Sequence, residues 1–370
     1  MEFLIETVKE VSLQQIVMWL IGGLLIFLAI KKDIEPALLL PMGFGAILVN
    51  IPHSAVIAED GGIIASLFKV GIEASEAMPL LLFIGIGAMI DFGPLLSNPK
   101  LFILGGAAQL GIFITLILAA VIGFPLNDAA SIAIIGAADG PTSILVALKL
   151  ASRYLGAIMV VAYSYMALVP IVQPAVVKLC TTKKERRIKM RYRAAQVSKL
   201  TRILFPVIVT IISGLIAPAS LSLVGMLMFG NLLRECGVLK TLSETAQNTL
   251  SNLITLLLGI TIAFQMQADQ FVTWETLMIM GLGLFAFVFD TIGGVMCAKL
   301  MNLFSKEKIN PMIGAAGISA FPMAARVVEK MGVKEDSTNH LLMHAVGANV
   351  SGQIASAIVG GLIIGLVLAV

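Results

Sequence analysis

Long apolar stretches alternate with short polar connections along almost the whole chain. They lie at 11–30, 36–52, 77–92, 101–124, 129–150, 154–177, 203–230, 250–268, 274–300, 309–328 and 341–368. A membrane-spanning helix needs about 20 mainly apolar residues, and most of these stretches reach that length. The pattern predicts an all-α polytopic membrane protein with roughly 10–11 spans.

Two of the apolar stretches contain residues that a regular helix does not accommodate. These residues are Asp139-Gly140-Pro141 in 129–150 and Gly314, Gly317 and Pro322 in 309–328. Proline lacks a backbone donor and clashes with the preceding turn, so a helix is expected to break there. We predict two broken helices, with Gly140, Pro141 and Gly314 as structural residues of the breaks.

Short sequence words repeat in the two halves of the chain. Residues 84–89 (IGIGAM) resemble 258–263 (LGITIA), and 135–143 (IGAADGPTS) resemble 313–320 (IGAAGISA), in the same order. Five predicted spans separate equivalent positions, and an odd number makes the halves antiparallel. Inverted repeats with broken helices near the bilayer midplane are typical of secondary transporters, although Gly-rich words also match by chance.

These features divide the chain into five regions. They are the N-terminal spans with an interfacial segment (1–76), a first inverted repeat with the break at Asp139 (77–177), a basic loop (178–202), a connecting span with an interfacial segment (203–249), and a second inverted repeat with the break near Gly314 (250–370).

Composition excludes the common soluble classes. Hydrophobic residues make up 58% of the 370 residues and charged residues 13%, whereas a soluble domain is about 25% charged. Cys180, Cys236 and Cys297 are far apart and match no disulfide or zinc spacing. We exclude a soluble enzyme, a secreted disulfide scaffold and a nucleic-acid-binding protein, and expect no nucleic-acid partner.

Positive charge is concentrated in one connection. Ten of the eleven charged residues from Lys178 to Arg202 are basic, and the positive-inside rule places such a loop in the cytoplasm. Orientation of the chain and contact with anionic lipid explain this charge; docking of a cytoplasmic partner is the alternative. The span count puts Lys31 and Lys32 outside, against the same rule.

Asp139 is the strongest candidate for ion binding. A carboxylate inside a span costs a few kcal/mol and is a functional candidate by default. The break frees backbone carbonyls, which together with this carboxylate and the hydroxyls of Thr142 and Ser143 make an all-oxygen site for a hard cation such as sodium. A structural pair between Asp139 and a neighbour is the alternative.

Neutral polar residues near the C-terminus are candidates to complete this site. Asn310 and Ser319 belong to the second broken segment. Asn349, Gln353 and Ser356 follow at i, i+4 and i+7, which places them on one helical face. Hydrogen bonding between helices in lipid is the alternative role of this row.

Arg326 and two tyrosines offer different chemistry. The guanidinium of Arg326 suits a planar carboxylate, or it reaches the interface as a snorkelling charge. Tyr163 and Tyr165 are two of only four tyrosines in the chain. They are candidates for interfacial anchors or for a proton donor inside the membrane.

Four motifs resemble one known family. They are AADGPTSI (137–144), AYSYMALVPIVQP (162–174), NPMIGAAGISAFPMAARV (310–327) and HAVGANVSGQIAS (344–356). They are similar to the β subunit of the sodium-pumping biotin-dependent decarboxylases, which serves oxaloacetate, methylmalonyl-CoA and glutaconyl-CoA decarboxylases. The resemblance runs through nearly the whole chain, from Asp33-Ile34-Glu35-Pro36 to the final span.

The resemblance implies a function, a fold and partners. The β subunit is a carboxybiotin decarboxylase: it decarboxylates N-carboxybiotin delivered by a partner and couples this to sodium export, with uptake of a proton. The implied fold is that of elevator-type sodium transporters with inverted repeats. The implied partners are a carboxyltransferase, a biotin carrier and small membrane subunits in the inner (plasma) membrane, with a homotrimer of this subunit.

The resemblance also implies roles for single residues. Those implied to hold sodium are Asp139, Asn310, Ser319 and Asn349. Those implied to act in catalysis are Tyr165, Ser319 and Arg326, with Arg326 holding the carboxylate of carboxybiotin.

Two functions of other classes remain as alternatives. One is a sodium- or proton-coupled secondary transporter without an enzymatic role, since one fold hosts many functions. The other is a structural membrane anchor for a soluble complex. Copurification with a biotinylated protein would favour the decarboxylase.

Overall fold

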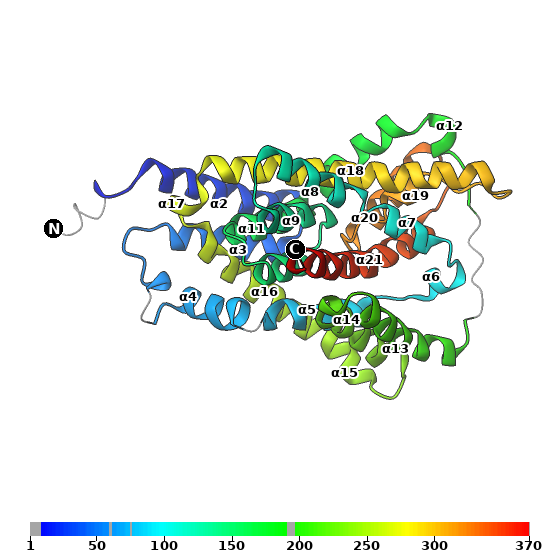
Figure 1. Ribbon diagram of the computed structural model, residues 1–370, viewed down its shortest axis with the longest axis horizontal. Helices are drawn as coiled ribbons and strands as arrows, with labels where there is room; N and C mark the ends of the chain where they lie inside the picture. Colours follow the sequence, from blue (N-terminus) through cyan, green and yellow to red (C-terminus); the bar gives the residue numbers. More distant parts are fainter. Residues whose placement is uncertain (1–8, 59–60, 75, 191–196, 370) are drawn as a thin grey trace.

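The computed structural model describes residues 9–58, 61–74, 76–190 and 197–369, which form an elongated bundle of helices (Figure 1). The α-helices are α2 (Leu13–Lys32), α3 (Pro36–Val49), α4 (Ile63–Phe68), α5 (Ala77–Met89), α6 (Gly93–Ser97), α7 (Leu101–Ala107), α8 (Leu110–Ile122), α9 (Leu126–Ala133), α10 (Gly140–Lys149), α11 (Leu155–Cys180), α12 (Lys183–Arg186), α13 (Lys199–Ile216), α14 (Leu221–Glu235), α15 (Lys240–Glu244), α16 (Ser251–Ile262), α17 (Ala268–Phe271), α18 (Trp274–Phe304), α19 (Met312–Ala315), α20 (Met323–Glu335) and α21 (Leu342–Leu368). Short 3-10 or π turns are η1 (Ala55–Ile57), η2 (Lys69–Glu73), η3 (Ile134–Ala137), η4 (Pro218–Ser220), η5 (Thr245–Leu250) and η6 (Ala263–Met266).

The number of spanning helices is lower than the sequence predicts. Within the described ranges, seven helical segments are long and apolar enough to cross a membrane, or eight if one bent pair counts as a span. These seven are Leu13–Lys32, Leu101–Ile122, Leu155–Cys180, Lys199–Ile216, Lys240–Met266, Trp274–Phe304 and Leu342–Leu368. The prediction of 10–11 spans is therefore higher than this number. Two apolar stretches turn back on themselves, α3 is only 14 residues long, and α5 belongs to the bent pair.

The first broken segment is a hairpin. The chain leaves η3 at Ala138, whose φ of 52° is left-handed, and α10 then runs back along α9. At the open end, Asn127 Nδ2 donates to Leu150 O at 3.3 Å, and Ser152 Oγ donates to Asp128 Oδ1 at 2.8 Å. We call residues 126–150 hairpin A; its two ends lie together and its tip contains Asp139.

The second broken segment has the same form. It consists of α19, an irregular turn and α20, and we call residues 310–335 hairpin B. Asn310 Nδ2 donates to Arg186 O and Ile188 O, both at 2.9 Å. Asn339, just beyond α20, donates to the same two carbonyl oxygens at 3.4 and 3.2 Å. Both ends of hairpin B are therefore attached to the loop after α11.

The two hairpins enter the bundle from opposite ends. Helix α8 packs antiparallel to α18, so the end of α8 lies near the start of α18. Hairpin A follows α8 and therefore begins at that end of the bundle. Hairpin B lies toward the end of α18, where Lys299 Nζ donates to Cys180 O at 3.1 Å. The tips meet between them, because Ser319 N donates to Ala137 O at 3.1 Å.

Close approach of helix α18 to hairpin B requires glycine on both sides. An added Cβ at Gly294 would lie 2.0 Å from Gly314 O, and one at Gly314 would lie 2.0 Å from Gly294 O. Small residues allow this backbone contact in membrane proteins. Gly314 therefore allows α18 and hairpin B to approach this closely.

The N-terminal pair of helices fixes where the first lysines lie. Asn50, at the end of α3, donates to Met266 O and accepts from Ala268 N, both at 2.7 Å, close to the start of α18. The other end of the α2–α3 pair, with Lys31 and Lys32, therefore points toward the basic loop. The span count gave the opposite result because it treated hairpin A as a crossing.

Candidate functional site

The carboxylate of Asp139 is buried at the tip of hairpin A and is 3% exposed. Its Oδ2 accepts hydrogen bonds from Thr142 Oγ1 at 2.6 Å, Ser356 Oγ at 3.2 Å and Gln353 Nε2 at 3.3 Å. Within the described ranges Asp139 forms no ion pair, so its negative charge faces only neutral donors. Gln353 and Ser356 lie on one face of α21, as their spacing predicts.

Helix α21 also holds the tip of hairpin B. Asn349 Nδ2 donates to Ile318 O at 2.7 Å, and Ser319 Oγ donates to Gly352 O at 3.1 Å. Asn349 Oδ1 is buried and has no hydrogen-bond donor. One face of α21 thus carries the unpartnered amide oxygen of Asn349, followed by Gln353 and Ser356, which both donate to Asp139.

Tyr163 lies directly against the break. A Cβ added to Gly140 would come within 2.3–2.5 Å of three ring atoms of Tyr163. The hydroxyl of Tyr163 is buried and has no hydrogen-bond partner. Pro141 falls in the first turn of α10, where its missing N–H leaves no bond unmade.

Tyr165 faces another way. Its hydroxyl donates to Met280 O of α18, and its ring packs where a Cβ at Gly283 would come 2.8 Å from Cε2. Residues two positions apart on a helix point about 200° apart, so Tyr163 and Tyr165 cannot share one site. The structure brings Tyr163 to Asp139 and packs Tyr165 against α18.

The arrangement of free oxygens suits a hard cation. The Asp139 carboxylate, the Asn349 amide oxygen and the Tyr163 hydroxyl are buried, and the last two lack partners. Carboxylate, amide and hydroxyl oxygens are the ligands that hard cations prefer. The donor set at the two tips is therefore compatible with sodium.

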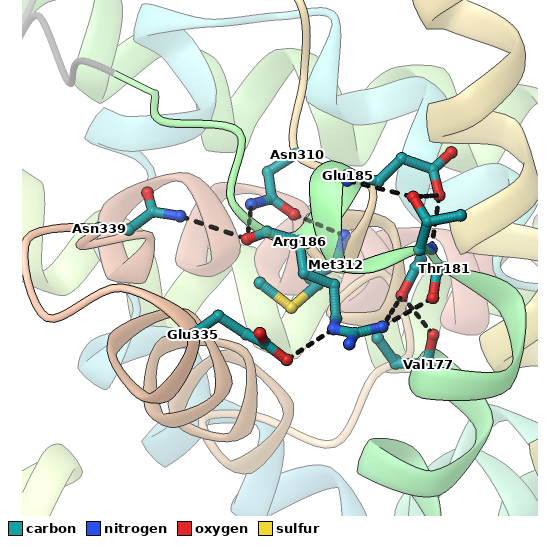
Figure 2. A network of polar contacts seen from close by, with 9 residues as sticks. Val177, Thr181, Glu185, Arg186, Asn310, Met312, Glu335 and Asn339 are labelled. Atoms are coloured by element: carbon teal, nitrogen blue, oxygen red, sulfur yellow. Dashed lines mark hydrogen bonds and ion pairs between the residues drawn. The ribbon is translucent and has the colours of Figure 1, made fainter.

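Asn310 lies apart from this cluster, at the base of hairpin B (Figure 2). Its Nδ2 is bound to two loop carbonyls, and its Oδ1 accepts from Met312 N at 3.1 Å. Ser319, its predicted co-ligand, lies at the opposite end of hairpin B, in the tip. In this structure Asn310 fixes the loop to hairpin B, and the side chains that donate to Asp139 are those of Thr142, Gln353 and Ser356 instead.

The same loop is held by charge, as Figure 2 shows. Arg186 Nε donates to Glu335 Oε1 at 2.7 Å, and Arg186 Nη1 donates to Thr181 O at 2.7 Å. The hydrogen bond from Arg186 lowers the pKa of the Glu335 carboxyl below its ordinary value. Residues 191–196 of the predicted basic loop lie outside the described residues.

Arg326 lies on α20, one turn after the tip of hairpin B, and is exposed. It is within electrostatic reach of Glu35 in the turn between α2 and α3. The structure therefore separates Arg326 on the outer face of hairpin B from Ser319 on its inner side.

Asp290 is a further buried acid that the predicted site leaves out. Its Oδ1 accepts from Ile112 N in the first turn of α8 at 3.2 Å, and its Oδ2 has no donor. An added Cβ at Gly136 would lie 2.5 Å from that Oδ2. The sequence indicates this residue only as an acid within the apolar stretch 274–300.

Comparison with known proteins identifies the family. Residues 14–367 match the family model described as the Na+-transporting oxaloacetate decarboxylase beta subunit. The chain is 48% identical to the methylmalonyl-CoA decarboxylase subunit beta of Propionigenium modestum, over 96% of this chain and 95% of that protein.

Two further relatives serve other decarboxylases. The glutaconyl-CoA decarboxylase subunit beta of Acidaminococcus fermentans is 48% identical, over 95% of this chain and 92% of that protein. The oxaloacetate decarboxylase beta chain of Klebsiella pneumoniae is 45% identical, over 96% and 95% respectively. With two helix breaks, a buried carboxylate between them and similarity along almost its whole length, the chain belongs to the family of sodium-transporting decarboxylase beta subunits.

Proposed function

We propose that this chain decarboxylates N-carboxybiotin, delivered by a biotin carrier, and couples the reaction to sodium export. The names of its relatives support a sodium-pumping decarboxylase. The observation that carries the coupling is the meeting of two hairpin tips at one buried carboxylate. An ion bound there would lie between two hairpins that enter from opposite ends of the bundle.

Sodium binds between the tips in this proposal. Asp139 supplies the charge, Asn349 the free amide oxygen and Ser319 a hydroxyl, and the Tyr163 hydroxyl is close enough to the break to join them. Binding neutralises Asp139, which favours movement of the hairpins as a unit. Export requires that the outward-facing state bind sodium more weakly than the inward-facing state.

Decarboxylation breaks the bond between the biotin ring nitrogen and the carboxyl carbon. Carbon dioxide leaves, the electron pair stays on nitrogen, and one proton is taken up there. Arg326 holds the substrate carboxylate by its fork of N–H donors. Ser319 is the group at the tip that we propose to pass the proton inward, since a positioned hydroxyl can serve as a general acid. Tyr165, the second proposed proton donor, has to leave its bond to Met280 O before it can take part.

The wider assembly follows from the same family. We propose that the hairpins are the centres of two inverted repeats that move as in an elevator-type transporter. The complex lies in the plasma membrane with the 178–202 loop in the cytoplasm. Its partners are a carboxyltransferase, a biotin carrier and small membrane subunits, around a homotrimer of this chain.

The test uses the purified complex in proteoliposomes. Asp139→Asn is expected to remove the sodium dependence of carboxybiotin decarboxylation and the parallel uptake of sodium. Thr115→Val, which removes a buried α8 hydroxyl that has no hydrogen-bond partner, is the matched control. Sodium dependence that survives in Asp139→Asn would show that the ion binds elsewhere.

A secondary transporter without an enzymatic role would use the same ion site. It predicts sodium movement driven by a gradient in the absence of any biotinylated partner. The relatives are decarboxylase subunits, which supports the pump.

A further inference from the structure

A groove runs along the outer face of hairpin B, between α11 and α20. Its volume is about 320 Å³, at the lower end of the range for small-molecule sites. It is lined by Pro170, Pro174, Lys178, Val327, Lys330, Met331, Lys334 and Glu335. The lining thus combines an apolar wall with three lysines.

The lysines continue a row that begins at Arg326. On α20, Arg326, Lys330 and Lys334 follow one another at intervals of four, and all three are exposed. Residues four apart lie on the same helical face, one turn above the other. On α11, Pro170, Pro174 and Lys178 keep the same interval. The groove therefore runs from lysines at the loop end up to Val327, the residue next to Arg326.

The three groove lysines are not neutralised. Within the described residues, Lys178, Lys330 and Lys334 form no ion pair, and the one acid of the groove, Glu335, is bound to Arg186. Arg326 forms no contact ion pair there but lies within electrostatic reach of Glu35. Unpaired cations along a groove attract anions and concentrate them there.

A second pocket shows the contrast. It has a volume of about 530 Å³ and lies between the loop and the start of α21. Of its lysines, Lys189 pairs with Asp336 at 3.0 Å, and Lys308 donates to Asn302 O at 2.6 Å. Its charges are largely occupied by the protein itself.

The position of Arg326 along α20 also favours water in the groove. Nine residues separate Arg326 from Glu335, which is about 13 Å along the helix. An arginine exposed to lipid at such a depth is costly, and such residues face a water-filled cavity instead. The groove lined by the lysines is the cavity next to it.

We propose that this groove admits the carboxylated biotinyl-lysine arm of the carrier. Lys178, Lys330 and Lys334 draw the carboxylate inward and pass it to Arg326. Pro170 and Pro174 contact the apolar part of the arm. The inference rests on the proposed decarboxylase function and names the route to its site.

The experiment measures decarboxylation of free N-carboxybiotin by the detergent-purified complex. Lys330→Glu with Lys334→Glu is expected to raise KM about tenfold and leave kcat within twofold, because uniform binding is lost. The matched control is Lys100→Glu with Lys308→Glu, in the other pocket, which is expected to keep both constants. Equal unfolding temperatures show that the variants fold.

Three outcomes overturn the proposal or its basis. An unchanged KM in Lys330→Glu with Lys334→Glu, beside an active wild-type complex, rules out the groove. A KM increase that appears only in vesicles with anionic lipid assigns the lysines to lipid headgroups. No decarboxylation by the wild-type complex at any carboxybiotin concentration instead refutes the proposed function.

Discussion

Tyr163 and Tyr165 differ in what their hydroxyl groups reach. Tyr165 donates to Met280 O, whereas the Tyr163 hydroxyl has no partner. Tyr165→Phe is expected to lower the stability of the protein by about 1 kcal/mol, the net worth of one hydrogen bond. Tyr163→Phe is expected to leave stability unchanged. Thermal unfolding in detergent measures both, and equal losses would contradict this assignment.

The packing of Tyr163 on the break predicts the effect of a single methyl group. In Gly140→Ala the new Cβ would meet the Tyr163 ring, and overpacking of this kind costs about 1–3 kcal/mol. We expect a lower unfolding temperature and a weaker apparent affinity for sodium. Gly225→Ala on α14, where a Cβ meets nothing within 4 Å, is the control and should keep both.

Single residues show where sequence reasoning reaches its limit. The burial of Asp139 at a helix break was predictable, because it is an acid beside Gly-Pro in an apolar stretch; its binding of sodium stays a prediction. Which tyrosine lies beside Asp139 was not predictable. The YSY motif indicates that the two phenol rings point in different directions, but the rotation of α11 about its axis decides that Tyr163 faces the break. Asn310 fell within a site motif, yet its partners are loop carbonyls that no pattern reveals.

At the scale of elements, hairpin B depends on the amides at its two ends. Asn310 is fully buried and its amide makes two bonds of 2.9 Å. Asn310→Ala removes both bonds and the bond that Met312 N donates to Asn310 Oδ1, and is expected to cost about 2 kcal/mol. Asn339→Ala, whose bonds are longer, should cost less. Unfolding temperatures give the order, and a larger loss in Asn339→Ala would contradict it.

The ion pair between the loop and α20 makes its attachment sensitive to pH. The hydrogen bond from Arg186 lowers the pKa of Glu335 in the folded protein. The stabilisation is therefore fully present above the unfolded pKa, about 4.3, and is lost as the pH falls through the lower folded value.

Cleavage by an added protease measures this attachment. At pH 7, Glu335→Gln is expected to increase cleavage in the 178–202 loop severalfold, since Arg186 loses its charged partner. Glu307 forms no ion pair within the described residues, so Glu307→Gln is the control, and its loop should be cleaved at the wild-type rate. Equal cleavage rates in all three proteins would show that the pair does not hold the loop.

The hairpins also explain why the span count failed. Residues 129–150 and 309–328 are long and apolar, and length with hydropathy is the whole basis on which a span is recognised. The break at Gly140-Pro141 indicates that the helix stops, but it does not give the direction in which the chain continues. Contacts such as Asn127 with Leu150 decide that, and they depend on tertiary structure.

For the whole molecule, the fold predicts which positions face the same side of the membrane. In a variant without native cysteines, Leu126→Cys and Arg153→Cys at the two ends of hairpin A should both react with an impermeant reagent from one side. Lys183→Cys, in the loop that holds hairpin B, should react only from the other side. Labelling of Leu126→Cys and Arg153→Cys from different sides would refute the hairpin.

The bond between Ser319 N and Ala137 O has an electrical consequence. In the proposed pump, the hairpins reach inward from opposite ends and this bond joins their tips, so the barrier that separates the two aqueous phases is thin there. In the proposed pump, most of the membrane voltage falls across this septum, and one charge crossing 100 mV requires about 2.3 kcal/mol. Turnover should therefore slow as the interior becomes more negative, even if the ion moves only a few ångströms.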